Sequence, residues 1–346
     1  MAGIFQNGLF SMGFDMDPTA AQIFTQAAAG SASSTTPFGF GYSWQNGNTP
    51  AGILFGTTLT TVIAGFRFNI SALPSSGTGF VCTFYDATAG AIQVALRINS
   101  AGQLQFYLGS GTGTTIGAAS AASTIVAGTW YYIECLVTIS ATVGVVTCNV
   151  NGTQVINATG QNTKSTANAY INAFQFQCVN TANYDDWYML DTTGTSPLNT
   201  FLGPVQVRGE KPNANSAVGG RNAWTPTNPT NVNYENVGNI PASASEYDYD
   251  NNPGDYDMFR FPALPSNVAT VLAVNEWALV ELDSSGARTV ELDCYSNGTD
   301  SPSAAFTPAA GTPTYYNQVS AVDPHTSAAW TVANAGAAEL GVKVQS

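Results

Sequence analysis

The sequence predicts an all-β protein, with an N-terminal jelly-roll sandwich followed by a second, smaller antiparallel β-sandwich. Three observations predict it. From residue 38 to residue 160, hydrophobic and polar residues alternate with a period of two. Turn-forming residues interrupt this alternation about every ten residues. Almost no segment shows the spacing of an amphipathic helix. Many short strands with frequent turns and few helices favour a sandwich or jelly roll.

The expected strands of the first domain follow one another at short intervals. They cover residues 61–70, 79–86, 91–98, 103–108, 129–137, 144–150, 153–156, 170–178 and 184–190. Two connections carry the signal of a tight hairpin, one at Asn99–Gly102 and one at Asn151–Thr153. Asparagine and glycine tolerate the positive φ angles that such turns need. The pattern therefore predicts antiparallel neighbours along most of this domain.

The length of 346 residues allows two domains of ordinary size. We expect the jelly roll to cover residues 1–207. Residues 208–256 are rich in Pro, Asn, Gly and Tyr, and we expect an extended connection there. Connections of this length are usually functional or ordered by packing on a neighbour. Residues 257–346 regain the alternating pattern and are expected to form the second sandwich.

The charge of the chain excludes some partners. The chain has 9 basic and 22 acidic residues, a net charge of −13, and only 9% charged residues in all. Binding a phosphate backbone requires several cations on one face, and no such cluster exists. We therefore exclude nucleic acid and anionic membrane surfaces as partners. The polar surface must be Ser, Thr, Asn, Gln and Gly, which is typical of extracellular, glycan-facing or virion proteins.

The five cysteines are an odd number without C-x-x-C spacing, and each lies in a hydrophobic run that predicts a strand. The simplest interpretation is that all five are buried free thiols that pack as small apolar residues. Cys135 and Cys148 would face each other if a hairpin turns near residues 141–142. A single cross-strand disulfide between these two therefore stays open as the alternative.

No secretion signal or membrane span is expected. Met1–Phe5 lacks the basic and long apolar regions of a signal peptide. No run of about 18 apolar residues is present. A neutral polar surface without a secretion signal suggests a protein that is assembled in a cytoplasm and exposed later, as virion proteins are.

The order of several short motifs resembles the concanavalin-A-like, laminin-G-like jelly roll. In chain order the motifs are Gly65–Phe68 (GFRF), Asn99–Gly102 (NSAG), Gly128–Tyr132 (GTWYY), Asn151–Thr153 (NGT) and Asp185–Tyr188 (DDWY). The resemblance covers residues 1–207. It implies that GTWYY is the signature strand, that NGT is the signature hairpin, and that Asp185 and Asp186 lie on the closing strand.

Three further segments resemble structural proteins of tailed bacteriophages and prophages. They are residues 191–194 followed by 199–207, residues 322–331 and residues 339–344. The resemblance implies a virion protein, and residues 199–207 would then be the strap that leads from the first sandwich to the second. It does not imply a position on the particle.

Catalytic chemistry finds little support in the sequence. The single histidine, His325, lies in a turn signal, so a Ser-His-acid set is not expected. Concanavalin-A-like glucanases carry an E-x-D-x-x-E strand that holds two carboxyls about 5 Å apart. Glu281–Asp283 and Glu291–Asp293 begin that motif, but Gly286 and Ser296 replace its second glutamate. We therefore expect the protein not to be an enzyme.

Calcium is the one metal that the resemblance implies, because laminin-G-like and lectin relatives often bind it with loop carboxylates. Asp248 and Asp250 begin a loop of alternating oxygens, but Pro253 and Phe259 stand where an EF-hand needs its glycine and its final glutamate. A calcium site of another kind is left open at Asp185, Asp186, Asp248 and Asp250. The alternative is that these acids are solvated or cap backbone amides.

Aromatic side chains near loops or strand ends are the candidates for stacking on sugar rings. The leading ones are Trp44, Trp187, Tyr188 and Tyr249, and the alternative is that they fill the core or pack against other subunits.

These observations predict a non-enzymatic bacteriophage virion surface protein, either a capsid decoration or a tail fibre or adhesin. It would act by protein–protein packing and by binding a host surface glycan, exposed on the particle exterior. Its partners would be other virion proteins and further copies of itself, as a trimer by analogy with other phage surface proteins. The alternatives are a carbohydrate-active glycan hydrolase and a soluble lectin.

Overall fold

The computed structural model describes residues 8–13, 24, 27–28, 30–39, 41–239, 242–243, 245–283 and 288–346. The chain divides into two compact units, residues 1–209 and residues 210–346. The segment that was expected to be an extended connection, residues 208–256, thus lies almost wholly within the second unit. Each unit is described by itself.

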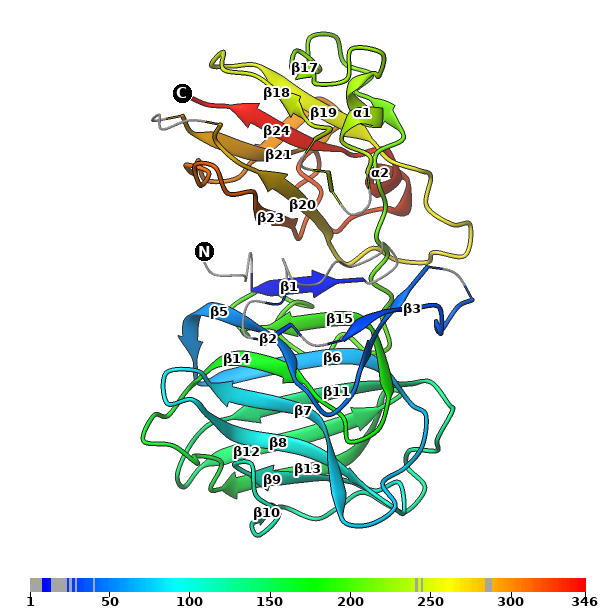
Figure 1. The fold of residues 1–346 in the computed structure, drawn as a ribbon, viewed down its shortest axis with the longest axis vertical. Helices are drawn as coiled ribbons and strands as arrows, with labels where there is room; N and C mark the ends of the chain where they lie inside the picture. Colours follow the sequence, from blue (N-terminus) through cyan, green and yellow to red (C-terminus); the bar gives the residue numbers. More distant parts are fainter. Residues whose placement is uncertain are drawn as a thin grey trace. The chain divides into compact units, whose positions relative to one another are not determined.

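The first unit consists of two antiparallel sheets (Figure 1). Sheet A has the order β13 (Thr153–Gln161), β12 (Gly144–Val150), β11 (Tyr131–Thr138), β6 (Thr61–Ile70), β15 (Ala182–Leu190), β4 (Ser43–Asn46) and β3 (Ser31–Ser33), and β1 (Leu9–Met12) also pairs with β15. Sheet B has the order β10 (Thr115–Ile116), β9 (Leu104–Leu108), β8 (Ala91–Asn99), β7 (Thr78–Asp86), β14 (Ile171–Phe176), β5 (Ala51–Leu59) and β2 (Ala27–Ala28). The prediction of an all-β chain of antiparallel sheets is confirmed.

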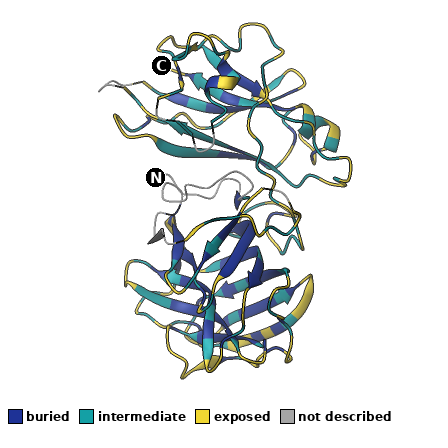
Figure 2. Ribbon diagram, turned by 45° about the vertical axis from the view of Figure 1, so that its right-hand side comes forward, coloured by how far each residue is buried: buried dark blue, intermediate teal, exposed yellow. Residues whose placement is uncertain are grey.

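Aromatic side chains join the two sheets of this unit. Phe66 of β6 lies 5.2 Å from Phe176 of β14, measured between ring centroids. Trp187 of β15 lies 4.8 Å from Phe176 and 5.5 Å from Phe174. All four side chains are fully buried, and Figure 2 shows most strands of this unit in the colour of buried residues. Aromatic burial of this kind dominates the energetics of a core, and it fixes which face of each strand points inward.

Both expected hairpins are present. Strands β8 and β9 pair around Asn99–Gly102, where Gly102 has a φ of 70°. Strands β12 and β13 pair around Asn151 and Gly152, with φ angles of 50° and 78°. Left-handed backbone favours asparagine and glycine, which is why the sequence signals these turns.

The cysteines are buried free thiols, as the simplest interpretation expected. Cys135 and Cys148 stand directly opposite each other on β11 and β12, so the expected juxtaposition is confirmed, although the two are not bonded. Burial raises the pKa of the Cys135 thiol well above its usual range, which disfavours the reactive thiolate.

The second unit is also antiparallel. A five-stranded sheet C has the order β16 (Ala214–Asn215), β19 (Tyr256–Arg260), β24 (Glu339–Val344), β21 (Val290–Ser296) and β22 (Thr299–Pro302). Two smaller sheets pair β20 (Val274–Val280) with β23 (Thr314–Ser320), and β17 (Thr225–Pro226) with β18 (Asp248–Tyr249). The helices are short, α1 (Asn233–Asn236) and α2 (Val332–Ala337). In the described part of the chain, no helix is long and apolar enough to cross a membrane.

The core of the second unit is smaller and more mixed than that of the first. Cys294, Trp330 and Ala338 form a buried cluster, and Val274 of β20 and Leu340 of β24 pack on it. Residues 213–216 lie along strand β19, because Asn213 and Ser216 donate backbone hydrogen bonds to the carbonyls of Arg260 and Met258. This pairing joins the start of the Pro/Asn-rich segment to sheet C.

Candidate functional site

A β-bulge shapes the two adjacent acids of β15. The register with β6 shifts between Asp185 and Tyr188, and Asp186 has a φ of 48°. A bulge adds one residue to one strand and re-aims the side chains beside it. Trp187 enters the core, whereas the Tyr188 ring lies over Gly65 on the outer face of sheet A, where a Cβ at Gly65 would come within 2.1 Å of that ring. The sequence pattern, with its period of two, does not show this bulge.

Arg67 neutralises Asp186 on this outer face. The Arg67 Nε lies 2.5 Å from Asp186 Oδ2, and the Asp186 side chain is 2% exposed. The guanidinium lies over two rings, with its central carbon 4.6 Å from the centroid of Phe38 and 5.4 Å from that of Tyr132. Charged hydrogen bonds and cation–π contacts together stabilise a buried ion pair of this kind.

The strap, residues 199–207, docks on the same face through its backbone. Gly203 donates its N–H to Glu134 Oε1 at 2.9 Å, and Val207 donates to Asp186 Oδ1 at 2.8 Å. The Tyr188 hydroxyl donates to Glu134 Oε1 at 2.5 Å and accepts from the N–H of Leu202 at 3.2 Å. Glu134 is 1% exposed. The acids of this face therefore serve as acceptors for a crossing chain.

Calcium does not fit Asp185 and Asp186. Both oxygens of Asp186 are engaged, one by a guanidinium and one by a backbone N–H. Asp185 Oδ1 accepts the N–H of Asp186 at 2.8 Å. A calcium site needs six to eight oxygen ligands, whereas the groups that face these carboxylates are cations and N–H donors. The alternative in which these acids cap backbone amides describes them better.

Three of the four candidate aromatics lie in the interior. Trp44 is 3% exposed, and Trp187 and Tyr188 are fully buried, so a sugar ring does not reach them. Tyr249 is 52% exposed. The sequence pattern predicted that all four lie near strand ends. The burial of the other three depends on the opposite sheet and on the strap, and the local sequence pattern does not show these contacts.

A second buried group of acids lies in the second unit. Asp257 of β19 and Asp248 of β18 are 3% and 9% exposed. Asn233 of α1 donates to Asp257 Oδ1 at 3.0 Å, and Asn222 donates to the same oxygen at 3.2 Å. Asn236 of α1 donates to Asp248 Oδ1 at 2.9 Å. Burial and the neighbouring Asp248 raise the pKa of Asp257 to about 9.

Calcium does not fit this group either. The asparagines present N–H₂ groups to the carboxylates, and turning those of Asn222 and Asn233 around would set their oxygens against the carbonyls of Met258 and Trp224. Asp250 Oδ1 accepts the N–H of Asn252 at 2.5 Å. Within the described residues, no three His, Cys, Asp or Glu side chains gather in a way that would hold a metal ion.

A shallow pocket of about 310 Å³ opens on the second unit close to these acids. It is lined by Lys211, Pro212, Asn213, Tyr234, Glu235, Gly238 and Asn239. We call it the Tyr234 pocket. No sequence motif points to these residues. The length and composition of residues 208–256 predicted only that this segment is functional or ordered by packing.

Local contacts hold the wall of this pocket. The backbone N–H of Tyr234 donates to Asn215 Oδ1 at 2.9 Å, and the N–H of Val232 donates to Glu235 Oε2 at 3.2 Å. Asn239 donates to Glu246 Oε2 at 2.6 Å. Gly238 lies so close to the chain that a Cβ there would come within 2.8 Å of the carbonyl oxygen of Tyr234. These contacts hold α1 and its flanks around the pocket.

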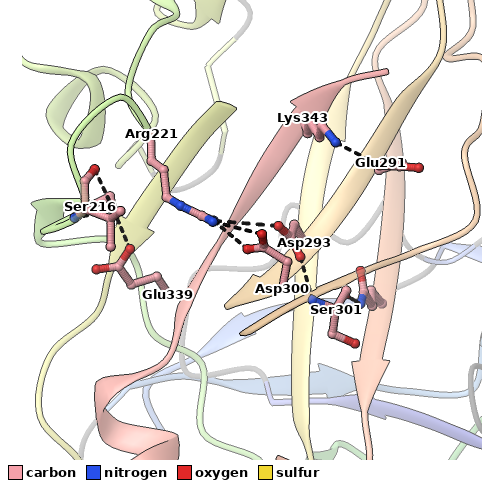
Figure 3. A network of polar contacts seen from close by, with 10 residues as sticks. Ser216, Arg221, Glu291, Asp293, Asp300, Ser301, Glu339 and Lys343 are labelled. Atoms are coloured by element: carbon pink, nitrogen blue, oxygen red, sulfur yellow. Dashed lines mark hydrogen bonds and ion pairs between the residues drawn. The ribbon is translucent and has the colours of Figure 1, made fainter. Parts of the chain in front are cut away.

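A polar network covers one face of sheet C (Figure 3). Arg221 Nη1 lies 2.7 Å from Asp300 Oδ1 and 3.8 Å from Asp293 Oδ2. Its guanidinium carbon lies 4.7 Å and 4.3 Å from the ring centroids of Tyr256 and Tyr295. Burial and the neighbouring Asp300 raise the pKa of Asp293 to about 6, whereas the hydrogen bond from Arg221 lowers the pKa of Asp300.

Comparison with known proteins gives few leads. No protein-family model matches the chain, and no curated protein sequence matches it. Among solved structures, the alginate lyase Aly36B is similar with 14% identity and a TM-score of 0.35, over 53% of this chain and 96% of that one. The carbohydrate-binding module CBM66 from Bacillus subtilis is similar with 11% identity and a TM-score of 0.32, over 54% and 96%. A Trypanosoma rangeli sialidase is similar with 12% identity and a TM-score of 0.32, over 43% of this chain and 25% of the sialidase.

These similarities correct one prediction. An alginate lyase and a sialidase are among the similar structures, so the prediction that the protein is not an enzyme is contradicted, and we withdraw it. One β-sandwich architecture hosts binding modules and enzymes alike, so the absence of a familiar motif did not justify that exclusion. The comparisons give no link to a bacteriophage particle, and the virion setting stays a prediction.

Proposed function

We propose that the protein recognises carbohydrate and that the Tyr234 pocket is a site of contact. The observation that carries the proposal is the composition of the pocket: one aromatic side chain beside two amides, one ammonium and one carboxylate. Such a lining suits the binding of a sugar chain, whether or not that sugar chain is then cleaved.

The chemistry of the lining suits a hydroxyl-rich ligand. Lys211 only donates hydrogen bonds, Glu235 as a carboxylate only accepts them, and Asn213 and Asn239 do both. A sugar hydroxyl is a donor and an acceptor at once, so it satisfies each of these groups. The Tyr234 ring offers an apolar surface with little conformational entropy to lose. A volume of about 310 Å³ lies at the small end of ligand pockets, which favours one or two rings of a longer chain.

A glycan array of neutral and acidic oligosaccharides, followed by calorimetry with the strongest binder, tests the proposal on the full chain. We expect Tyr234→Ala to weaken binding at least tenfold, as removal of a central aromatic anchor does. Tyr249→Ala is the matched control, because Tyr249 is exposed in the same unit and does not line the pocket. Absence of binding to every oligosaccharide, or equal loss in both variants, would refute the proposal.

The setting of such recognition is proposed to be the exterior of a bacteriophage particle. The support is the resemblance of residues 191–194 followed by 199–207, 322–331 and 339–344 to phage structural proteins, together with the neutral polar composition. The partners would be other virion proteins and further copies of this chain. Quantifying the protein in purified particles tests this: hundreds of copies indicate capsid decoration, a few indicate a tail fibre, and none contradicts the setting. Light scattering that shows a monomer would contradict the expected trimer.

A carbohydrate-active enzyme is the second candidate, and one observation favours it. Asp293 and Asp300 are neighbouring acids whose pKa values move in opposite directions, beside two tyrosines on a face where the Asp300 side chain is 35% exposed. Pairs of this kind divide the roles of acid and base in many enzymes. Asp293, whose side chain is 1% exposed, would then hold the proton, and Asp300 would be the ionised partner that a substrate can reach.

Release of new reducing ends from the bound polysaccharide tests this candidate. We expect Asp293→Asn and Asp300→Asn each to lower the rate at least a hundredfold, as loss of a general acid or base does, while oligosaccharide binding is retained. Asp255→Asn is the control, because Asp255 lies on the same unit outside this pair. No product from any bound polysaccharide, or equal rates in all variants, would eliminate the candidate.

A further inference from the structure

Helix α1 carries two residues that line the pocket, Tyr234 and Glu235. Its other two residues anchor it on its buried side. Asn233 and Asn236 point into the unit and are 7% and 0% exposed. Each donates its side-chain N–H₂ to a buried carboxyl group, Asn233 to Asp257 and Asn236 to Asp248. A helix of four residues has no stability of its own, so its position depends on such contacts.

The two carboxyl groups meet each other beneath the helix. Asp257 and Asp248 lie close enough for each carboxyl group to shift the pKa of the other. Two ionised carboxylates have no donor between them, so a hydrogen bond between the two groups requires a proton on one of them. Among the described residues, no amide or hydroxyl donates to the buried Oδ2 of Asp248. A protonated Asp257 would supply a donor for that oxygen.

We propose that Asp248 and Asp257 are positioning residues that share one proton, and that this proton holds α1 and thereby the wall of the Tyr234 pocket in place. Binding in the pocket would then be sensitive to pH, and in this respect the inference rests on the proposed function. A divalent cation between the two carboxyls is the obvious alternative, and the inward-facing amide N–H₂ groups oppose it.

Among the residues that the structure describes, no other charged group near the pair compensates its charge, because the charged neighbours on the surrounding elements face elsewhere. Arg221 pairs with Asp300, and Lys343 approaches Glu291. Glu339 accepts the N–H of Ala217, Glu235 accepts that of Val232, Asp250 accepts that of Asn252, and Asp255 accepts from the side chain of Asn252. Loss of the shared proton therefore leaves two like charges together in a buried site.

The direction of the pH effect follows from linkage. Burial and the neighbouring Asp248 raise the pKa of Asp257 to about 9, although the hydrogen bonds from Asn222 and Asn233 act in the opposite direction. A carboxyl group whose pKa is raised in the folded state stabilises that state fully below the ordinary pKa. This stabilisation is lost as the pH rises to the raised value. Docking of α1 is therefore firm in mildly acidic solution and weakens toward pH 9.

Asp257→Asn removes the titratable carboxyl group but keeps the size and shape of the side chain. The new amide offers an oxygen to Asn222 and Asn233 and a permanent N–H donor to Asp248, so it reproduces the protonated state at every pH. Asp255→Asn is the matched control, because Asp255 lies two residues away on the same segment and outside the pair. If Asp257→Asn does not fold, Asp248→Asn serves in its place, because its amide also supplies a permanent donor between the two groups.

The experiment measures two quantities on the full chain, each at pH 6 and at pH 9.5. The first is amide hydrogen exchange of residues 233–237 without ligand, corrected for the intrinsic effect of pH. The second is the signal on the oligosaccharide array. In the wild type and in Asp255→Asn we expect exchange to rise, and array binding to fall, at least tenfold between the two pH values. In Asp257→Asn both should change less than twofold.

The outcomes distinguish this inference from the proposed function. If exchange depends on pH as described but the array is silent at both pH values, the acid pair positions α1 and carbohydrate recognition is refuted. If the array responds but exchange and binding change equally in the wild type and in Asp257→Asn, the shared proton is refuted and recognition stands. A rise in the melting temperature on adding CaCl₂, lost in Asp257→Asn, would also overturn the shared proton.

Discussion

Asp186 in the first unit and Asp257 in the second unit are buried to the same degree but are compensated in different ways. Asp186 is 2% exposed and lies 2.5 Å from a guanidinium nitrogen. Asp257 is 3% exposed and is surrounded by amides and a second carboxyl group. Burying a charge requires a partner or its neutralisation. The first unit supplies a cation, and the second supplies a proton.

Because of this difference, the ion pair of the first unit should not depend on pH, whereas the carboxyl pair of the second unit should. Arginine stays charged at every physiological pH, so the ion pair that anchors the strap persists in all ordinary conditions. A proton shared between carboxyl groups leaves as the pH rises. We therefore expect the outer face of sheet A to be permanent, and the pocket-bearing segment of the second unit to respond to its surroundings.

Among substitutions of charged groups, the largest expected effect comes from breaking the ion pair of the first unit. Arg67→Met leaves Asp186 buried without its cation, and we expect the free energy of unfolding of this unit to fall by about 3 kcal/mol. Urea denaturation followed by hydrogen exchange in strands β6 and β15 measures it. The double variant Arg67→Met with Asp186→Asn should recover much of the loss; no recovery would show that the guanidinium acts through packing on Phe38 and Tyr132 rather than through charge.

The second effect concerns the pH dependence of the second unit. Its free energy of unfolding should fall as the pH rises from the ordinary range of an aspartate pKa to the raised value of about 9, by at most about 1.4 kcal/mol per pH unit. Thermal unfolding at several pH values, with exchange in β19 as the probe, measures the slope. Asp257→Asn should flatten it, and a slope that persists in this variant would assign the dependence to other groups.

A smaller effect is expected where the strap meets Glu134. Glu134→Gln keeps an acceptor for Tyr188 and Gly203 but removes the charge from both hydrogen bonds, which should weaken strap docking by about 1 kcal/mol. The exchange rate of the Gly203 amide should then rise about fivefold. Glu291→Gln is the control, since Glu291 lies in the second unit with its Oε2 3.9 Å from Lys343 Nζ. Equal exchange in both variants would mean that Glu134 does not anchor the strap.

The smallest effect is expected at the exposed aromatic. Tyr249→Ala should change the free energy of unfolding by less than about 0.5 kcal/mol. Substitutions of exposed residues that make no buried or capping contact usually have effects of this size. Trp187→Ala, which empties part of the core, should cost about 3–5 kcal/mol. Chemical denaturation of both variants provides the comparison. A large loss in Tyr249→Ala would show that its ring supports the β17–β18 pair.

The candidate sites were harder to predict than the strands, for a reason visible at Asp185 and Asp248. Asp185 stood out in the sequence as an acid beside aromatics and Asp248 as the start of a loop of alternating oxygens, and calcium was left open at each. Whether such an acid meets a metal, a guanidinium, an amide or a proton depends on residues far away in the chain. Arg67 lies 119 residues before Asp186, and Asn222 lies 35 residues before Asp257. No local spacing encodes these partners.

The sequence by itself determined the all-β fold, most of the strands, the hairpins at Asn99–Gly102 and Asn151–Gly152, and the burial of the cysteines. These features follow from side-chain alternation and from backbone preferences that act within a few residues. Only the tertiary structure decided that Trp187 faces the core, that the strap covers Tyr188, and that residues 211–213 line one pocket with residues of α1 and its C-terminal flank. Each of these depends on long-range packing, in which a bulge or a single buried acid changes what a side chain meets.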